Sequence, residues 1–365
     1  MIGIYIHIPF CMSKCPYCDF YSLRSDGETM EKYTEAVIRE IMAFEKSEEA
    51  DTVYFGGGTP SVLGAERLCR ILSAVREKFT LVSPEITVEC NPSTTSEAFY
   101  KALAESGVNR ISLGMQSAVD RERSILGRVA GRKEVQKSIE DARKSGIKNI
   151  SLDLMLGVPF QDSESLLASI MFIKQQDVEH VSAYMLKIEE GTFFHKFQDK
   201  LPLPDEDSVC DMYLFLCDYM EKLGYKQYEI SNFAKPGYAS RHNMKYWKDE
   251  EYVSFGPASH SFYNGERYYY ERDLQKYITA PEKIPDGKGG TKEEYIMLAL
   301  RLSRGLVFSE YEEKFGEKIP DALLSKAQEY RKLGFLKQTG GSIALTKEGF
   351  LISNTIIGDL ISTLD

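Results

Sequence analysis

The sequence has no long apolar run, no excess of basic residues and few cysteines. A helix that crosses a bilayer needs about 20 consecutive apolar residues, and no stretch approaches that length. The first residues also lack the basic stretch that precedes the apolar core of a signal peptide. We therefore expect a cytoplasmic protein without a membrane anchor.

The formal net charge is −10, with acidic and basic residues interleaved along the chain. A nucleic-acid-binding surface would need a basic stripe to neutralise phosphates, so we expect no nucleic-acid partner. The hydrophobic share of 43% and the charged share of 27% are ordinary for a globular protein. With 365 residues, the chain is long enough for a barrel and an appended domain.

The chain contains seven cysteines, an odd and unevenly spaced set. In a reducing compartment this pattern argues against a disulfide scaffold and favours ligand or redox chemistry at some of them. Three of the seven, Cys11, Cys15 and Cys18, fall within eight positions, directly after an apolar strand pattern. The other four fit helix or strand packing positions, so the cluster is where we expect chemistry.

The first half of the chain alternates β-branched runs with longer amphipathic stretches. The predicted strands are Ile2–Ile8, Thr52–Gly56, Glu85–Cys90, Arg110–Met115, Ile147–Leu156 and Val178–Leu186. The predicted helices between them are Thr29–Lys46, Ala65–Lys78, Ser96–Ser106, Lys133–Ser145 and Ser163–Gln176. This alternation predicts an α/β fold with a partial (β/α)6 barrel of the TIM type over residues 1–190. An open doubly wound sheet is the alternative, which pattern alone leaves open.

The rest of the chain divides into two predicted regions. Residues 191–285 form an aromatic-rich region that we expect to close the barrel, and Pro281–Gly290 is a predicted linker, because it is rich in proline and glycine. The sequence pattern of residues 286–365 predicts a winged-helix-like α/β domain. Its predicted elements are the helices Lys292–Arg304, Ser309–Phe315 and Asp321–Leu333, the hairpin Phe335–Leu345 and a last helix, Thr346–Leu360. The third helix lacks a basic face, so we expect a substrate or partner lid rather than a DNA reader.

The Cys11-x3-Cys15-x2-Cys18 spacing suits an iron–sulfur cluster. Three thiolates leave one iron of a four-iron cluster without a protein ligand, and that iron could be chelated by the amino and carboxylate groups of S-adenosylmethionine (SAM). Structural zinc is one alternative, with His7 as the nearby fourth ligand. A redox dithiol of Cys15 and Cys18 is another, although it leaves Cys11 unexplained.

Further polar and glycine positions follow the later predicted strands. The glycines of Gly56–Pro60 would let backbone groups approach a ligand closely. The segment is not a phosphate-binding loop, because no Gly-Lys-Ser/Thr follows it. A plain strand-to-helix turn is the alternative. Glu89 and Gln116 end two strands, and Asp153 lies within a third. Strand ends of a barrel converge on one face, which favours a shared site. Arg128 is a weaker candidate, with an exposed arginine as its alternative.

These motifs resemble the oxygen-independent coproporphyrinogen III oxidase group of radical SAM proteins. The matching segments are Tyr5–Cys11, the cysteine loop, Gly56–Pro60, Glu89–Pro92, Leu113–Ser117 and Asp153–Pro159, in order over nearly the whole chain. The resemblance implies a radical SAM core barrel with a [4Fe-4S] cluster on Cys11, Cys15 and Cys18. It implies SAM contacts from Tyr5, Tyr17, Gly57, Gly58, Thr59, Glu89, Gln116, Arg128 and Asp153. The last three could belong to a second SAM position of the oxidase.

Two departures from the oxidase lead to a subgroup. The oxidase carries a further cysteine where this chain has Phe20, and an extension before the first strand, where this chain begins. Arg241–Trp247 matches the His-Asn-x-x-Tyr-Trp signature of the heme-chaperone subgroup. That resemblance implies porphyrin metabolism, with heme as cargo and a respiratory heme protein as recipient, and cluster and SAM controlling heme binding, dimerisation or release.

The signature has two interpretations at the level of residues. A neutral imidazole such as His242 can ligate heme iron, and Tyr246 and Trp247 can stack on a flat macrocycle. Alternatively the segment is a packed loop, with His242 hydrogen-bonded to Asn243 or to backbone. Among functions, the alternatives to a heme chaperone are oxidative decarboxylation of coproporphyrinogen III, which we do not expect, and a radical SAM reaction on another substrate. Whether SAM is cleaved is left open.

Overall fold

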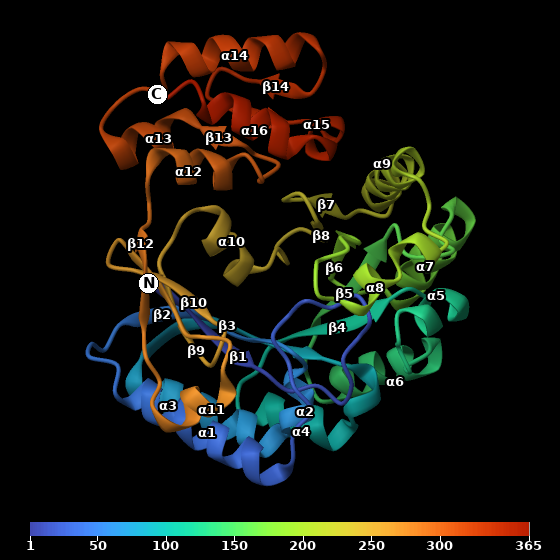
Figure 1. Cartoon of the computed structure of the whole chain (residues 1–365), viewed down its shortest axis with the longest axis vertical. Helices are drawn as coiled ribbons and strands as arrows, with labels where there is room; N and C mark the ends of the chain where they lie inside the picture. The colour runs from blue at the N-terminus through green and yellow to red at the C-terminus, as the bar shows by residue number, and fades with distance from the viewer. Residues whose placement is uncertain (365) are drawn as a thin grey trace.

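The computed structural model describes residues 1–364, which contain one large and one small β-sheet (Figure 1). Six parallel strands form the centre of the large sheet in sequence order. They are β1 (Ile2–Ile8), β2 (Glu49–Gly57), β3 (Thr80–Cys90), β4 (Arg110–Gln116), β5 (Asn149–Leu156) and β6 (His180–Met185). The helices of the crossovers are α1 (Gly27–Met42), α2 (Pro60–Leu63), α3 (Ala65–Lys78), α4 (Glu97–Glu105), α5 (Asp120–Ile125), α6 (Arg132–Lys144) and α7 (Ser163–Gln176). The predicted βα alternation is confirmed.

The two faces of the central sheet differ because side chains alternate along each strand. In β1, Ile2, Ile4, Ile6 and Ile8 are buried in the hydrophobic core. The intervening side chains point into the barrel, where Tyr5 stacks on Tyr54 of β2. The same alternation places polar side chains on the inner face of the other strands: Thr52, Thr87, Glu89, Arg110, Ser112, Ser151, Asp153, His180 and Ser182. The interior is therefore polar enough to receive a charged ligand.

The sheet is extended at both edges. Beside β1, β9 (Tyr252–Phe255) pairs in parallel and continues into the antiparallel strands β10 (His260–Tyr263), β11 (Glu266–Tyr269) and β12 (Ile284–Lys288). Beside β6 lie β8 (Asn232–Ala234) and β7 (Lys226–Gln227). Within residues 1–364 no ladder joins β7 to β12, so the barrel is partial. This confirms the predicted fold class.

One predicted connection is a strand. The proposed linker Pro281–Gly290 contains β12, which pairs with β11 across an irregular register. An edge strand tolerates Pro285, whose missing N–H faces no further strand, and Gly287 has a φ of +88° that few other residues adopt. Proline and glycine content alone therefore misled the prediction.

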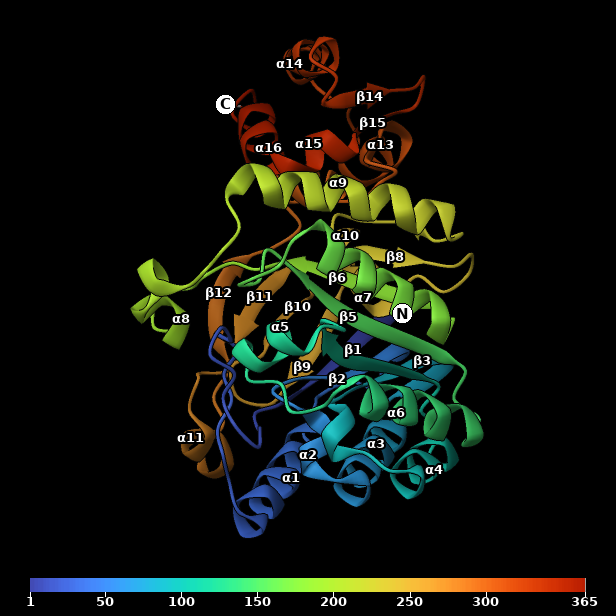
Figure 2. The same ribbon diagram turned by 90° about the vertical axis from the view of Figure 1, so that its right-hand side faces the viewer.

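The C-terminal part forms a separate α/β layer above the barrel, with α9 (Glu206–Lys222) between the two (Figure 2). Its elements are α12 (Lys292–Ala299), β13 (Leu306–Val307), α13 (Phe308–Phe315), α14 (Asp321–Lys332), β14 (Leu336–Gln338), β15 (Ser342–Leu345), α15 (Lys347–Leu351) and α16 (Ser353–Ile361). The predicted hairpin is present, but the predicted first helix ends at Ala299 and the predicted last helix is two helices. In residues 1–364, every helix is too short or too polar to span a bilayer.

The remaining elements are short helices and turns. They include α8 (Phe193–Lys196), α10 (Arg241–Trp247) and α11 (Leu274–Thr279), together with the short 3-10 turns Pro92–Thr94 and Gln198–Lys200. Helix α10 carries the His-Asn-x-x-Tyr-Trp signature and lies between the large sheet and the C-terminal layer (Figure 1). The signature is therefore positioned by both parts of the molecule.

Candidate functional site

The three clustered cysteines lie on a loop whose ends are tied together. Phe10 forms a bridge with Leu23, the Cys11 amide donates to the Leu23 carbonyl at 3.0 Å, and the Leu23 amide donates to the Pro9 carbonyl at 2.8 Å. All three cysteines are partly exposed. The loop therefore presents three thiols at the carboxyl end of β1 from a fixed base.

The glycine turn after β2 supports this loop directly. The amide of Gly58 donates to the Ile8 carbonyl and that of Thr59 to the Phe10 carbonyl, both at 2.8 Å. Thr59 Oγ1 lies 3.4 Å from Cys11 Sγ. A Cβ on Gly58 would lie 2.8 Å from the Phe10 carbonyl oxygen, closer than real contacts allow. The turn is thus part of the cysteine loop's support, more than a plain strand-to-helix connection.

The far side of the loop packs on a small apolar cluster. The Phe194 amide donates to the Pro16 carbonyl at 3.0 Å, and the Tyr17 ring lies 6.3 Å from the Phe194 ring. Arg128 Nη2 donates to the Tyr17 hydroxyl at 2.8 Å, and its Nε is buried without a partner in the described residues. Arg128 is therefore a partner of the cysteine loop, and the exposed-arginine alternative does not describe it.

The donor set of the loop fits an iron–sulfur cluster with three protein ligands. Burial raises the pKa of Cys18, and the neighbouring Cys15 and Cys11 thiols add to that shift. Within residues 1–364 no three histidine, cysteine or carboxylate side chains are gathered closely enough to hold a metal ion as they stand. His7 is not free to complete a zinc site, because its ring nitrogens bond the Tyr5 hydroxyl and the Tyr21 carbonyl at 3.2 and 3.1 Å.

A pocket of about 480 Å³ opens beside the loop. Its lining comprises Tyr5, His7, Phe20, Tyr21, Gly57, Glu89, Tyr246, Trp247, Tyr252, Ala258, Ser259, His260 and Arg272. Three of the predicted SAM residues, Tyr5, Gly57 and Glu89, therefore share one cavity with the aromatic residues of the α10 signature. This size and this mixture of aromatic and polar groups suit an organic ligand.

Glu89 is the carboxyl group of this pocket. It accepts hydrogen bonds from the Tyr54 hydroxyl at 2.7 Å and from the Gly57 amide at 3.2 Å. Burial raises its pKa to about 7, so its charge changes near neutral pH. The ionised form could bind an ammonium group or ribose hydroxyls.

Gln116, Arg128 and Asp153 form a second polar group outside the lining of this pocket. Asp153 Oδ1 accepts from Ser112 Oγ at 3.0 Å, and burial raises the pKa of Asp153. A Cβ on Gly114 would lie 3.2 Å from Gln116 Nε2 and 3.4 Å from Arg128 Nη1, so these two side chains meet over that glycine. Gln116, the last residue of β4, has a φ of +67°, a strained value for a residue other than glycine.

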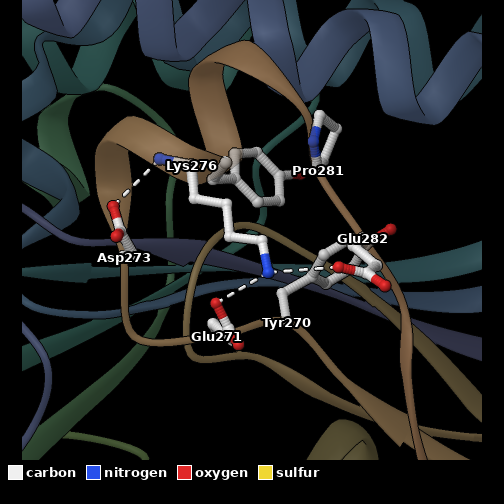
Figure 3. Close-up of a pocket in the computed structure, with 7 residues that line it drawn as sticks. Tyr270, Glu271, Asp273, Lys276, Pro281 and Glu282 are labelled. Atoms are coloured by element: carbon white, nitrogen blue, oxygen red, sulfur yellow. Dashed lines mark hydrogen bonds and ion pairs between the residues drawn. The ribbon is translucent and has the colours of Figure 1, made fainter.

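A smaller pocket carries no comparable chemistry. It measures about 10 Å³, room for about one water, and lies where Lys276 bonds Glu271 and Glu282 at 2.9 and 3.1 Å (Figure 3). Its polar groups are already paired. The pocket beside the cysteine loop is therefore the candidate site.

Comparisons with known proteins agree with this geometry. The Radical SAM superfamily model matches residues 5–173 and the HemN C-terminal domain model matches residues 292–352. The heme chaperone HemW of Lactococcus lactis is 36% identical over 370 residues, covering 96% of this chain and 95% of that protein. The chain belongs to the HemW family of radical SAM proteins. HemW of Bacillus subtilis is 35% identical and covers all of both chains, and HemW of Escherichia coli is 36% identical over 71% of this chain.

A solved structure shows the same fold as this HemW-family chain. Coproporphyrinogen III oxidase (HemN) of Escherichia coli superposes with a TM-score of 0.85 over 99% of this chain and 90% of that chain, at 20% identity. The likeness confirms the partial barrel with its C-terminal α/β domain. At this identity it concerns the fold alone.

In the HemW-family signature on α10, Tyr246 and Trp247 line the pocket, whereas His242 is packed inside the protein. His242 Nδ1 lies 2.8 Å from Thr52 Oγ1 and Nε2 lies 2.8 Å from the Tyr246 hydroxyl, and the ring stacks on Tyr54. Its side chain is buried, and burial lowers its pKa to about 3. The packed interpretation describes this arrangement, although the partners are Thr52 and Tyr246 rather than Asn243 or backbone. As placed, His242 offers no free nitrogen to an iron.

Sequence reasoning missed part of the pocket. Tyr252, His260 and Arg272 come from β9, β10 and the segment after β11 and reach the site only because β9 pairs with β1. No local motif marks them. His7, which the sequence suggested as the fourth ligand of a zinc site, lines the pocket.

Proposed function

We propose that this protein is a heme chaperone that binds heme in the pocket beside the cysteine loop and delivers it to a heme protein of the respiratory chain. The observation that carries the proposal is the sequence match to the Lactococcus and Bacillus chaperones, which extends over nearly the full length of the chain at 36% and 35% identity. The pocket supports it, because Trp247, Tyr246 and Tyr252 supply aromatic surface for a flat macrocycle.

The same proposal assigns the cofactors. Cys11, Cys15 and Cys18 would hold a [4Fe-4S] cluster, which, once reduced by an external electron donor, would supply an electron to the sulfonium of SAM. Glu89 would accept a hydrogen bond from the amino group of SAM, and the backbone of Gly57 and Gly58 would allow the close approach of SAM. Tyr5, Tyr17, Thr59, Gln116, Arg128 and Asp153 complete the proposed SAM contacts. The separate placement of Gln116, Arg128 and Asp153 is compatible with a second SAM position.

Heme titration of the whole protein tests the proposal. Trp247 is the only tryptophan in the sequence and lines the pocket, so bound heme should quench its fluorescence while a Soret band develops. The protein would be reconstituted anaerobically with iron and sulfide. Trp247→Phe is the control: it should lose the fluorescence signal and keep the Soret change.

A second arm addresses catalysis and delivery. Reconstituted protein with SAM and a reductant would be given coproporphyrinogen III, and heme-loaded protein would be mixed with a heme-free respiratory cytochrome. We expect heme transfer to the cytochrome and no protoporphyrinogen. Turnover to protoporphyrinogen, or absence of heme uptake, would overturn the chaperone proposal. Mass measurement with and without SAM would show whether the proposed homodimer forms.

A further inference from the structure

The pocket contains few atoms that are free to bind iron. Protein ligands to heme iron are histidine, cysteine, methionine and tyrosine, and the lining contains two histidines and four tyrosines but no cysteine or methionine. Most of their polar atoms are already hydrogen-bonded. The bonds are Tyr5 hydroxyl to His7 Nδ1 (3.2 Å), His7 Nε2 to Tyr21 carbonyl (3.1 Å), Leu274 amide to Tyr21 hydroxyl (2.9 Å), Tyr246 hydroxyl to His242 Nε2 (2.8 Å) and Arg267 Nη1 to Tyr252 hydroxyl (3.4 Å).

His260 is the exception among these side chains. Its ring makes no hydrogen bond within the described part of the chain, and the nearest carboxylate, Asp286 Oδ2, lies 3.9 Å from Nδ1. The ring stacks on Tyr269 with centroids 5.2 Å apart, which fixes its plane. Its side chain is 60% exposed, so an incoming ligand can reach it. Partial burial lowers its pKa, which favours the neutral imidazole that binds metal.

The three histidines outside the pocket lining are excluded as heme ligands by their contacts or by their position. Both ring nitrogens of His180 are bonded, to Ser151 Oγ at 2.7 Å and to the Tyr228 hydroxyl at 2.8 Å. His242 is buried with both nitrogens bonded. His195 is exposed on α8 and does not line the pocket. The elimination therefore leaves one of the five histidines of the chain.

We propose that His260 ligates the iron of bound heme, and that His242 is a positioning residue that holds Tyr246. The proposal rests on the proposed heme-chaperone function and names the ligand within it. Asp286 would accept a hydrogen bond from Nδ1–H and so direct Nε2 at the iron. Arg272, on the same rim of the pocket, would meet a propionate of the macrocycle; in the structure it bonds the Asp19 carbonyl at 3.1 Å.

The test is a heme titration of the reconstituted full chain carrying His260→Ala, compared with wild type and with His195→Ala. His195 is the matched control, because it is an exposed histidine outside the pocket. We expect His260→Ala to weaken heme binding by at least about tenfold and to shift the Soret band, with added imidazole restoring the wild-type spectrum. His195→Ala should behave as wild type.

The outcomes separate the two proposals. If wild type takes up no heme, the chaperone function itself fails. If wild type binds heme and His260→Ala keeps the same affinity and spectrum, the ligand assignment is wrong while the function stands. The assignment is also wrong if His242→Ala removes the imidazole-ligated spectrum in a protein that still unfolds cooperatively near the wild-type temperature. Recovery with imidazole excludes a merely structural effect of His260→Ala.

Discussion

Glu89 is the carboxyl group of the pocket, and its surroundings set the pH at which it becomes charged. Burial holds its pKa at about 7, although the Tyr54 hydroxyl and the Gly57 amide both stabilise the ionised form. A hydrogen bond from the amino group of bound SAM would favour the carboxylate further. The residue would therefore couple ligand binding to the loss of a proton.

This coupling predicts a pH dependence of SAM binding. Between pH 6 and 8 the carboxylate fraction of Glu89 rises from about a tenth to about nine tenths, so SAM affinity should rise by up to about tenfold. Glu89→Gln, which keeps an acceptor oxygen but no charge, should bind more weakly and show little change over that range. Calorimetry on the reconstituted protein measures both. Equal affinity of wild type at pH 6 and pH 8 would contradict the role of Glu89.

The stability of the same two proteins provides the control. Since the pKa of Glu89 is higher in the folded chain than its usual value of 4.5, the unfolded chain loses this proton first as pH rises. Wild-type stability should therefore fall between pH 4.5 and 7, by at most about 3 kcal/mol, and Glu89→Gln should lack that contribution. The limit is an upper one, because the carboxyl group borders the open pocket.

At the scale of elements, the cysteine loop depends on the turn that follows β2. The amide of Gly58 bonds the Ile8 carbonyl, and there is no room for a Cβ beside the Phe10 carbonyl. Both neighbours are backbone atoms of the strand end that carries Cys11. A change in this turn is therefore transmitted to the cysteines.

We predict that Gly58→Ala weakens cluster retention. The added methyl group must push the turn from the loop base, which should cost about 1–3 kcal/mol of stability and displace Cys11. The matched control is Gly27→Ala at the start of α1, where no atom lies within 4 Å of the new Cβ. Iron and sulfide content after anaerobic reconstitution is the measurement. Full cluster content in Gly58→Ala would show that the loop holds its shape without this turn.

The elements also show what sequence patterns can predict. The strands β1–β6 were predictable because each alternates aliphatic residues for the core with polar or small residues for the interior, as in Ile2–Ile8. β12 was not, because an edge strand can contain Pro285 and Gly287, which elsewhere indicate a linker. That Cys11, Cys15 and Cys18 share one loop after β1 was predictable, because their spacing is local. His260 was not, since only the pairing of β9 with β1 brings it to the pocket.

At the scale of the whole molecule, an ionic cluster joins the barrel to the C-terminal layer. Asp249, two residues after the α10 signature, has a fully buried side chain that accepts from Lys314 Nζ of α13 at 2.6 Å. Arg267 of β11 bonds Glu294 of α12, also at 2.6 Å. Burial raises the pKa of Asp249, whereas the hydrogen bond and the charge of Lys314 favour the carboxylate and partly offset that effect. The cluster thus fixes the C-terminal layer behind the pocket wall.

The fluorescence of Trp247 can be used to follow the contact between the barrel and the C-terminal layer. The guanidinium of Arg301, just after α12, lies 5.6 Å from the centre of the indole ring, and Trp247 also lines the pocket. Loosening the C-terminal layer should therefore expose the indole. Because the chain has no second tryptophan, the emission comes from this position alone.

We predict that Lys314→Met destabilises the protein and exposes Trp247. The substitution keeps much of the side-chain volume but leaves the buried Asp249 carboxylate without its nearest cation, a loss of about 1–3 kcal/mol for a pair that is partly exposed on the lysine side. Thermal unfolding and acrylamide quenching of Trp247 would measure the two effects. Lys318→Met, on a nearby exposed lysine without an ion pair in the described residues, is the control and should change neither. If Lys314→Met lowers stability while quenching stays at the wild-type value, the C-terminal layer contributes to folding but does not position the pocket wall.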